Sequence, residues 1–214
     1  MNRTEFIEAL ARLGITLNEE QEIKLEKFYK LLIAWNNKIN LTRIVEKEDV
    51  YLKHFYDSLT ITKVVDLTKI ETLCDVGSGA GFPGIVLKIV FPNLKITLVD
   101  SLLKRVNYLN TIIKELELEN IQAIHIRSEE LQGKFDVVTA RAVANIEKLL
   151  TYTMHLVSKN GMLIAMKGNI SEELTPEIAK KINQKYKIKL VEEFMLPKEN
   201  SKRSLVVITN KQKV

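Results

Sequence analysis

Half of the glycines in this 214-residue chain lie close together. The chain has 8 glycines, and 4 of them fall between positions 77 and 84, in the segment DVGSGAGFPG. This segment follows the apolar run 71–76 and leads into the apolar stretch 84–90. Glycine permits a positive φ and a close approach of the backbone to a ligand, and a helix that follows directs its N-terminus at that ligand. A strand, a glycine-rich turn and a helix in this order therefore predict a cofactor site.

Short apolar runs alternate with amphipathic stretches from residue 70 onwards. We expect strands at 71–76, 95–100, 122–126, 135–140, 162–167, 187–195 and 204–209. We expect helices at 84–90, 102–118, 146–157 and 172–183. Repeated strand–helix units are typical of a parallel sheet with helices on both faces. Only a loop separates the last two strands, so they should pair antiparallel. The pattern predicts an α/β, Rossmann-like fold with a mostly parallel seven-stranded sheet and an antiparallel last strand.

The first 66 residues show helical periodicity instead. Apolar residues recur at helical spacing in 6–13 and 23–35, and a third helix is expected at 49–65. Asn18 and Gln21 match a capping box at the start of the second helix. No Gly or Pro occurs between positions 15 and 76, which argues against a flexible linker. We expect residues 1–66 to form a helical extension packed on a cofactor-binding domain at 67–214.

Two cofactors fit the glycine segment. Gly79 to Gly84 matches G-x-G-x-x-G, and Asp100 follows about 20 residues later at the end of the second strand, where a carboxylate can bind ribose hydroxyls. These features suit a nicotinamide dinucleotide. The same segment matches the acidic-x-G-x-G-x-G pattern of S-adenosylmethionine (SAM) methyltransferases, with Asp75 as the acidic residue. The antiparallel last strand favours the methyltransferase fold.

Other polar residues follow the third and fourth expected strands. Ser128 and Glu129 come after the third strand, and Arg141 comes directly after the fourth. Ligands of doubly wound sheets bind beyond the carboxyl ends of the strands, so these side chains should line one crevice. Ser128 and Glu129 would lie near an adenine edge, and Arg141 could hold a carboxylate or RNA.

Positive charge is concentrated near the C-terminus. The net charge is +5, but residues 180–214 hold 10 basic and 3 acidic side chains, a net of +7. Basic surfaces attract polyanions because each neutralised phosphate releases counterions, although a solvated lysine-rich face would have the same composition. The residues expected to bind RNA are Lys104, Arg105, Lys167, Lys202 and Arg203, together with the C-terminal lysines Lys211 and Lys213.

Several classes of protein are excluded or disfavoured. The single cysteine, Cys74, excludes a disulfide framework and a Cys-rich zinc site, and the three histidines lack metal-ligand spacing, so we expect no metal site. The apolar runs are too short to span a bilayer and the N-terminus lacks the apolar core of a signal peptide, so we expect a cytoplasmic protein. His54 and Asp57, spaced i, i+3 on the third helix, are expected to bond each other in a structural pair.

Several short motifs occur in a fixed order along nearly the whole chain. They are WN-x3-NLT at 35–42, H-x2-DS at 54–58, DVGSGAGFPG at 75–84, DS-x2-KR at 100–105, RSEE at 127–130, T-x-RA at 139–142 and RSLVVI at 203–208. In these motifs the chain resembles the ribosomal RNA small subunit methyltransferase G family, also called the glucose-inhibited division protein B family. Ser78, Ala80 and Thr139 depart from residues common in that family, and none of them carries a role assigned here.

The resemblance implies a class I SAM-dependent methyltransferase fold with a helical extension. It implies methyl transfer from SAM to N7 of a guanine in 16S rRNA near the decoding region. The expected partners are 16S rRNA or the small ribosomal subunit, and we expect a monomer. A non-catalytic SAM-sensing RNA-binding regulator and an NAD-dependent oxidoreductase are the alternatives.

The resemblance also assigns the cofactor site. It implies that Gly77, Phe82, Ser128, Glu129 and Arg141 contact SAM, beside Gly79 and Gly81 of the glycine segment and Asp100 from the ribose argument. Guanine N7 carries a lone pair and no proton, so we assign no catalytic acid or base.

Overall fold

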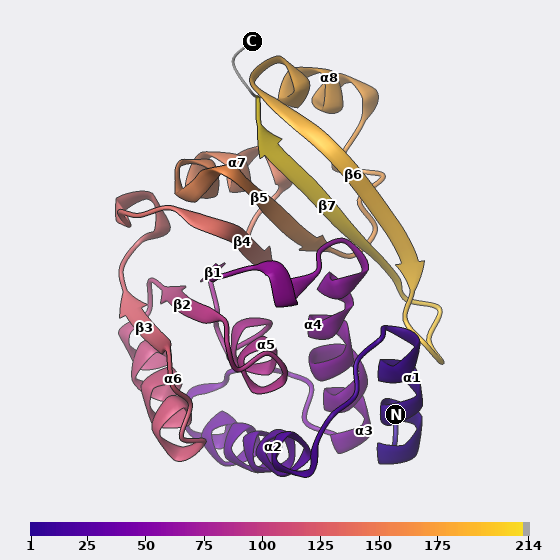
Figure 1. Ribbon diagram of the computed structural model, residues 1–214, viewed down its shortest axis with the longest axis vertical. Helices are drawn as coiled ribbons and strands as arrows, with labels where there is room; N and C mark the ends of the chain where they lie inside the picture. Colours follow the sequence, from indigo (N-terminus) through magenta and orange to yellow (C-terminus); the bar gives the residue numbers. More distant parts are fainter. Residues whose placement is uncertain (212–214) are drawn as a thin grey trace.

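One seven-stranded sheet runs through the computed structural model, which describes residues 1–211 (Figure 1). The strands are β1 (Thr72–Val76), β2 (Lys95–Asp100), β3 (Ile121–His125), β4 (Phe135–Arg141), β5 (Val157–Lys167), β6 (Tyr186–Met195) and β7 (Lys202–Asn210). Their order is β3-β2-β1-β4-β5-β7-β6. The pairs from β3 to β5 are parallel, whereas β7 is antiparallel to both β5 and β6. The predicted α/β, Rossmann-like fold with a reversed last strand is confirmed.

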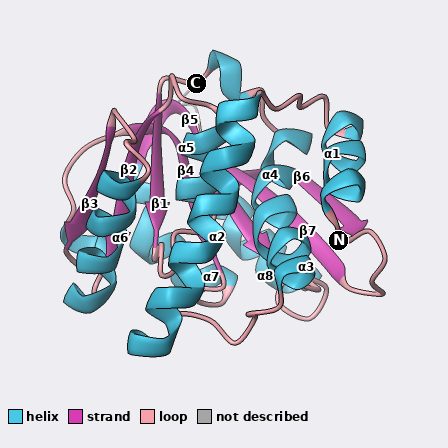
Figure 2. Ribbon diagram, turned by 90° about the horizontal axis from the view of Figure 1, so that it is seen from below, coloured by secondary structure: helices cyan, strands magenta, loops and turns pink. Residues whose placement is uncertain are grey.

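Helices cover both faces of the sheet. They are α1 (Arg3–Arg12), α2 (Glu19–Ile39), α3 (Lys47–Val50), α4 (Asp57–Leu59), α5 (Gly84–Val90), α6 (Leu103–Glu115), α7 (Ile146–Thr153) and α8 (Pro176–Lys185). One apolar cluster joins the N-terminal helices, α5 and α6 to one face (Figure 2). A second cluster joins α7 and α8 to the other face. No helix within residues 1–211 combines the length and the apolar character that crossing a membrane requires.

The N-terminal helices pack directly on the sheet domain. Phe28 of α2 and Phe55 are fully buried and stack with ring centroids 5.6 Å apart, and Phe82 from the glycine segment packs against both rings. The predicted capping box is confirmed, since Asn18 accepts from the Gln21 N–H and Gln21 accepts from the Asn18 N–H. The contacts give the extension and the sheet domain a continuous core.

The third expected helix is present but irregular. It runs through α3, a π-helical turn at Tyr51–Tyr56, α4 and a 3-10 turn that ends at Lys63. Single π-helical turns are rare and occur often at functional sites. The turn carries His54, and Asp57 follows it directly.

Several expected boundaries are wrong. The expected helices at 102–118 and 146–157 end earlier, at Glu115 and Thr153, and two elements start four or five residues from the expected position. Strand β5 begins at Val157, five residues before the expected start, because Val157 pairs with Phe135 across an irregularity in the ladder. Helix α8 begins at Pro176 rather than at 172, because the Thr175 side chain caps it by accepting from the Ile178 N–H. Pro176 at the first helical position lacks the N–H that a helix start leaves unpaired.

Candidate active site

A cavity of about 300 Å³ lies where β1, β2 and β4 end. Its lining comes from the ends of these strands, the loops after them, the segment that follows β3, and α7. The residues are Val76, Gly77, Val99, Asp100, Ser101, Arg105, Ile126, Arg127, Ser128, Glu129, Arg141, Ala142, Val143 and Tyr152. Gly77, Asp100, Ser128, Glu129 and Arg141 from the predicted cofactor site are thus brought together. We call this space the cofactor cavity.

The glycine segment bounds this cavity as a tight turn. Gly77, Gly79 and Gly81 have φ values of +70°, +57° and +94°, which disfavour a residue with a side chain. A Cβ at Gly77 would lie 2.7 Å from Val143 Cγ2. The shape of this turn therefore requires glycine at position 77.

Asp100 ties the glycine turn to β2. Its Oδ2 accepts from the Gly79 N–H at 2.9 Å, and its Oδ1 accepts from the Leu102 N–H at 2.9 Å. Arg105 lies 3.5 Å from the same carboxylate. Since each carboxylate oxygen has two lone pairs, Asp100 keeps capacity for a ribose hydroxyl.

Three predicted cofactor residues do not line the cavity. The Gly79 N–H is donated to Asp100, and the Gly81 N–H is donated to the Ser78 carbonyl at 2.8 Å, so both glycines shape the turn. Phe82 is buried, and its ring stacks on His54 at 4.4 Å between centroids. The Arg141 guanidinium lies over the Phe82 ring, with its carbon Cζ 5.2 Å from the ring centroid. Contact of these three residues with a cofactor stays a prediction.

Asp75 supports the turn from within the sheet. Its side chain is buried, and Oδ2 accepts from the Gly84 N–H at 3.0 Å. Oδ1 has no hydrogen-bond partner within residues 1–211. Burial raises the pKa of Asp75 to about 6. The motif's acidic residue thus anchors the first turn of α5, consistent with a structural role.

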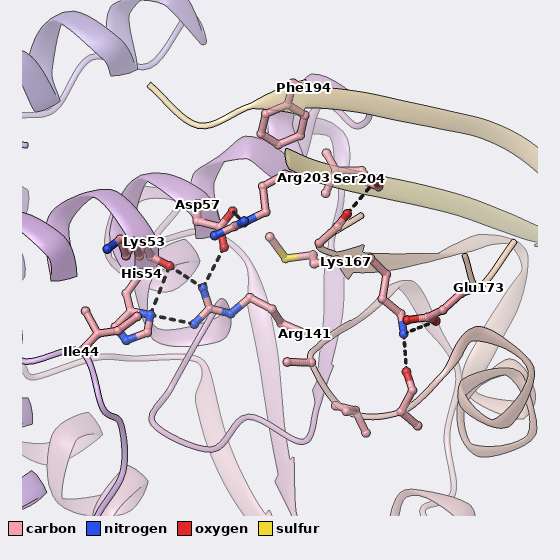
Figure 3. A pocket seen from close by; sticks show the side chains of 16 residues that line it. Ile44, Lys53, His54, Asp57, Arg141, Lys167, Glu173, Phe194, Arg203 and Ser204 are labelled. Atoms are coloured by element: carbon pink, nitrogen blue, oxygen red, sulfur yellow. Dashed lines mark hydrogen bonds and ion pairs between the residues drawn. The ribbon is translucent and has the colours of Figure 1, made fainter. Parts of the chain in front are cut away.

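Figure 3 shows a second cavity, which has a volume of about 540 Å³. Both cavities are lined by Arg141, Ala142 and Val143. The other walls come from the loop after α2, the helical segment that carries His54 and Asp57, the segment after β4, the ends of β5 and β6, the start of β7, and the segment after β5. These residues are Ile44, Lys53, His54, Asp57, Ala144, Met166, Lys167, Gly168, Glu173, Phe194, Arg203, Ser204 and Leu205. We call this space the substrate cavity.

Arg141 connects the end of β4 to the helical extension. Its Nη1 donates to the Lys53 carbonyl at 3.0 Å and to Asp57 Oδ2 at 3.1 Å, and its Nη2 lies 3.1 Å from His54 Nδ1. Burial lowers the pKa of this guanidinium, and Asp57 opposes the shift. Arg203 of β7 donates from Nε to the other Asp57 oxygen at 3.1 Å. One carboxylate therefore joins an arginine of β4 to an arginine of β7.

His54 is held neutral in this network. His54 Nδ1 lies between a donor, Arg141 Nη2 at 3.1 Å, and an acceptor, the Lys53 carbonyl at 3.2 Å, and Nε2 lies 2.9 Å from Thr42 Oγ1. Burial, and next the Arg141 charge, lower the pKa of His54 to about 3. Neither ring nitrogen is free to take a proton from a substrate. The expected bond between His54 and Asp57 is absent within residues 1–211, because both side chains bond Arg141 instead.

The NLT motif completes the network. Asn36 Oδ1 accepts from the Leu41 and Thr42 N–H groups at 2.7 and 2.8 Å, and Asn40 ends α2 in the left-handed conformation. These contacts turn the chain so that Thr42 reaches His54. Motifs from four parts of the sequence thus meet at one wall of the substrate cavity.

The residues predicted to bind RNA differ in their surroundings. Lys104 is exposed, whereas Arg105 lines the cofactor cavity beside Asp100. The other three are paired, as Lys167 with Glu173 at 2.8 Å, Lys202 with Glu193 at 2.8 Å and Arg203 with Asp57. Lys211 is exposed, and Lys213 lies outside the described residues. RNA contact by this set stays a prediction.

Sequence reasoning missed some cavity residues. Tyr152 of α7 lines the cofactor cavity, and Glu173 and Phe194 line the substrate cavity. None belongs to a recognisable motif, and their positions depend on how α7, β5 and β6 pack. Within residues 1–211, no group of three or more His, Cys, Asp or Glu side chains is placed to hold a metal ion.

Comparisons with known proteins point to one family. A family model described as rRNA small subunit methyltransferase G matches residues 21–206. Proteins called ribosomal RNA small subunit methyltransferase G from Bacillus velezensis and Lysinibacillus sphaericus are 44% and 45% identical to the chain. Each alignment covers 97% of this chain and 90% of the relative.

Solved structures share the fold at low sequence identity. A SAM-dependent methyltransferase from Aquifex aeolicus superposes with a TM-score of 0.56 at 19% identity, covering 76% of this chain and 93% of that one. A ribosomal protein L11 methylase from Lactobacillus delbrueckii subsp. bulgaricus gives a TM-score of 0.57 at 17% identity, covering 78% and 80%. The reversed β7 and the relatives together favour the methyltransferase interpretation over the nicotinamide one. The chain belongs to the rRNA small subunit methyltransferase G family.

Proposed function

We propose that this chain transfers a methyl group from SAM to N7 of a guanine in 16S rRNA. The observation that carries the proposal is the pair of adjoining cavities, which share Arg141, Ala142 and Val143. A cofactor in one cavity and a base in the other would meet at this shared wall. Family membership supplies the reaction class and the kind of RNA.

The polar groups that line the cofactor cavity suit SAM. SAM supplies a methyl group on a positively charged sulfur. Asp100 would accept from the ribose hydroxyls, and Ser128 and Glu129 would face the adenine edge. Gly77 leaves room at the turn, where a Cβ would meet Val143.

The chain's own task is positioning rather than proton transfer. Guanine N7 is a lone-pair nucleophile without a proton, so no base is required. Holding two reactants in line can lower a barrier by roughly 7–11 kcal/mol. His54 is neutral and bonded on both nitrogens, so it suits a structural role in which it holds Arg141 in place.

The helical extension would supply four of the sixteen residues that line the substrate cavity. Residues 1–66 contribute Ile44, Lys53, His54 and Asp57 to the substrate cavity, and the methyltransferase domain at 67–214 contributes the remainder. We further propose that the protein acts as a monomer in the cytoplasm, on 16S rRNA or on the small ribosomal subunit. A guanine N7 within A-form RNA faces a deep, narrow groove, so the target should be unpaired or splayed out.

The test is transfer of labelled methyl from SAM to small-subunit RNA isolated from cells that lack the protein. We expect label in a single nucleotide that is recovered as 7-methylguanosine after digestion. Label in another nucleotide, or at another atom, would refute the N7 assignment. Binding of SAM without transfer to RNA or to small subunits would favour a regulator over an enzyme.

A further inference from the structure

The lone pair on N7 does not explain why a guanine would be chosen. Adenine carries the same lone pair on N7, so discrimination between the two purines requires contacts with another edge of the base. Guanine presents donors there, N1–H and the N2 amino group, whereas adenine presents an acceptor at N1. A site selective for guanine therefore needs an acceptor, and best a charged one, in the substrate cavity.

We propose that Glu173 reads the Watson–Crick edge of the target guanine. This inference rests on the proposed function, since it concerns the base held in the substrate cavity. The carboxylate would accept hydrogen bonds from N1–H and from the N2 amino group. It would also repel the N1 lone pair of adenine, so one group would attract guanine and reject adenine.

Glu173 has an oxygen to offer. Its Oε2 accepts from the Ile146 N–H at 3.0 Å and from Lys167 Nζ at 2.8 Å. These two bonds fix the carboxylate in one orientation. Its Oε1 forms no hydrogen bond within residues 1–211, and the side chain is 34% exposed at the cavity. The group is therefore both positioned and available.

The other carboxylate that lines the cavity is already engaged. Asp57 Oδ1 accepts from Arg203 Nε and Asp57 Oδ2 accepts from Arg141 Nη1, both at 3.1 Å. Two arginines therefore already neutralise the Asp57 carboxylate. Among the described residues of the lining, Glu173 is the carboxylate left for a base.

The direction of Glu173 suits the reaction. Figure 3 shows Glu173 and Lys167 on one side of the cavity and His54 and Asp57 on the other, with Arg141 between them. Arg141 also borders the cofactor cavity. A guanine whose Watson–Crick edge faces Glu173 would present its adjacent Hoogsteen edge, which carries N7, roughly at right angles to the Glu173 contact, where the border with the cofactor cavity lies.

The Lys167 contact strengthens the assignment. Lys167 also donates to the Ala144 carbonyl, and so links Glu173 to the segment between the two cavities. Lys167 and Glu173 thus hold the segment after β4, in which residues 142 and 143 line both cavities. Glu173 is in this sense a specificity residue supported by a positioning lysine.

The experiment compares guanine with inosine, which lacks only the N2 amino group. Small-subunit RNA is ligated so that the mapped target position alone carries guanine or inosine, and kcat/KM is measured for each RNA. A hydrogen bond to a charged acceptor predicts that the wild-type protein prefers guanine by about 10- to 100-fold. In Glu173→Gln, which keeps the shape and loses the charge, this preference should fall by about 10-fold.

A matched control is available on the neighbouring helix. Glu147 of α7 pairs with Lys181 at 2.6 Å and lies outside both cavities, so Glu147→Gln should keep the wild-type preference. SAM affinity, measured in parallel, reports whether each variant retains its fold.

Two results would overturn the proposal. The first is equal kcat/KM for guanine and inosine in the wild-type protein, which decides the matter even if the variant fails to fold. The second is an equal loss on both RNAs in Glu173→Gln, which would limit Glu173 to holding Lys167 and Ile146. Failure of the proposed function would look different, since the wild-type protein would then form no 7-methylguanosine on the guanine RNA.

Discussion

At the scale of single residues, the site is organised around one arginine with three partners. Arg141 bonds the Lys53 carbonyl, Asp57 and His54, and lies over the ring of Phe82. The fork of the guanidinium suits such a set, because its five N–H groups point in fixed directions. Lysine could not replace it without loss of most of these contacts.

His54 should make stability depend on pH. Its pKa falls from an ordinary 6.5 to about 3 in the folded state, so the unfolded chain binds more protons between these values. The contribution of neutral His54 to the free energy of unfolding is complete above pH 6.5. Below that pH the free energy of unfolding falls by at most about 1.4 kcal/mol per pH unit. In His54→Asn, whose side-chain oxygen can still accept from Arg141, urea unfolding should show a weaker fall in stability between pH 6.5 and 4.5.

The matched control is His125→Asn, because His125 is an exposed histidine on β3. We expect this variant to follow the pH dependence of the wild-type protein. Parallel stability curves for wild type and His54→Asn over the same range would contradict the account of a buried neutral histidine.

The sequence predicts these residues better than it predicts their partners. His54, Asp57 and Arg141 belong to motifs that a family resemblance marks. The spacing of His54 and Asp57 suggested a bond between them, yet Arg141 enters between them from 84 residues away in the chain. Local spacing cannot show this, because the contact depends on how the extension packs against β4.

At the scale of elements, β1 and α5 approach each other closely. Gly84 begins α5, and a Cβ there would lie 2.2 Å from Leu98 Cδ2 of β2 and 2.8 Å from Asp75 Oδ2 of β1. The last of the four clustered glycines therefore serves the packing of a helix on two strands. This reason differs from that of Gly77, where the positive φ and the cavity require glycine.

Gly84→Ala should consequently destabilise the fold. Overpacking of this kind costs about 1–3 kcal/mol, measured as the free energy of unfolding in urea. Gly168→Ala is the matched control, since nothing lies within 4 Å of a Cβ at that glycine. Equal stability of the two variants would show that α5 can shift away from β2 at little cost.

Element types were predictable where local patterns are strong. The expected helix at 84–90 matches α5, and the expected strand at 95–100 matches β2. The start of β5 was not predictable, because it is set by pairing with β4 across an irregular ladder. The π-helical turn before α4 likewise leaves no periodic signal in the sequence.

At the scale of the whole molecule, the two ends of the sheet differ in how far their basic side chains are paired with carboxylates. Each cation that lines the substrate cavity has a carboxylate partner. Arg141 and Arg203 share Asp57, Lys167 pairs with Glu173, and Lys53 pairs with Asp49 and Glu199. A compensated site suits the reaction, because a guanine methylated at N7 gains positive charge. The unusual feature of the composition, a C-terminal segment with a net charge of +7, therefore does not create a strongly basic cavity.

The uncompensated lysines lie elsewhere. Lys187 and Lys189 are exposed on the edge strand β6, and with Lys159 and Lys211 they line a cavity of about 710 Å³ without a carboxylate. This cavity lies at the start of β5, whereas the substrate cavity lies at its end. The sequence predicted the excess charge but not this separation, which follows from the antiparallel pairing of β6 and β7.

The central claim, methyl transfer to one guanine N7, is tested most directly by removing that atom. Small-subunit RNA with 7-deazaguanine at the mapped target position keeps the donors of the Watson–Crick edge and replaces N7 with carbon. We predict that this RNA still binds the protein and accepts no labelled methyl, while the matching guanine RNA is labelled. Label on the 7-deazaguanine RNA at the wild-type rate would contradict the claim and place the methyl group on another atom.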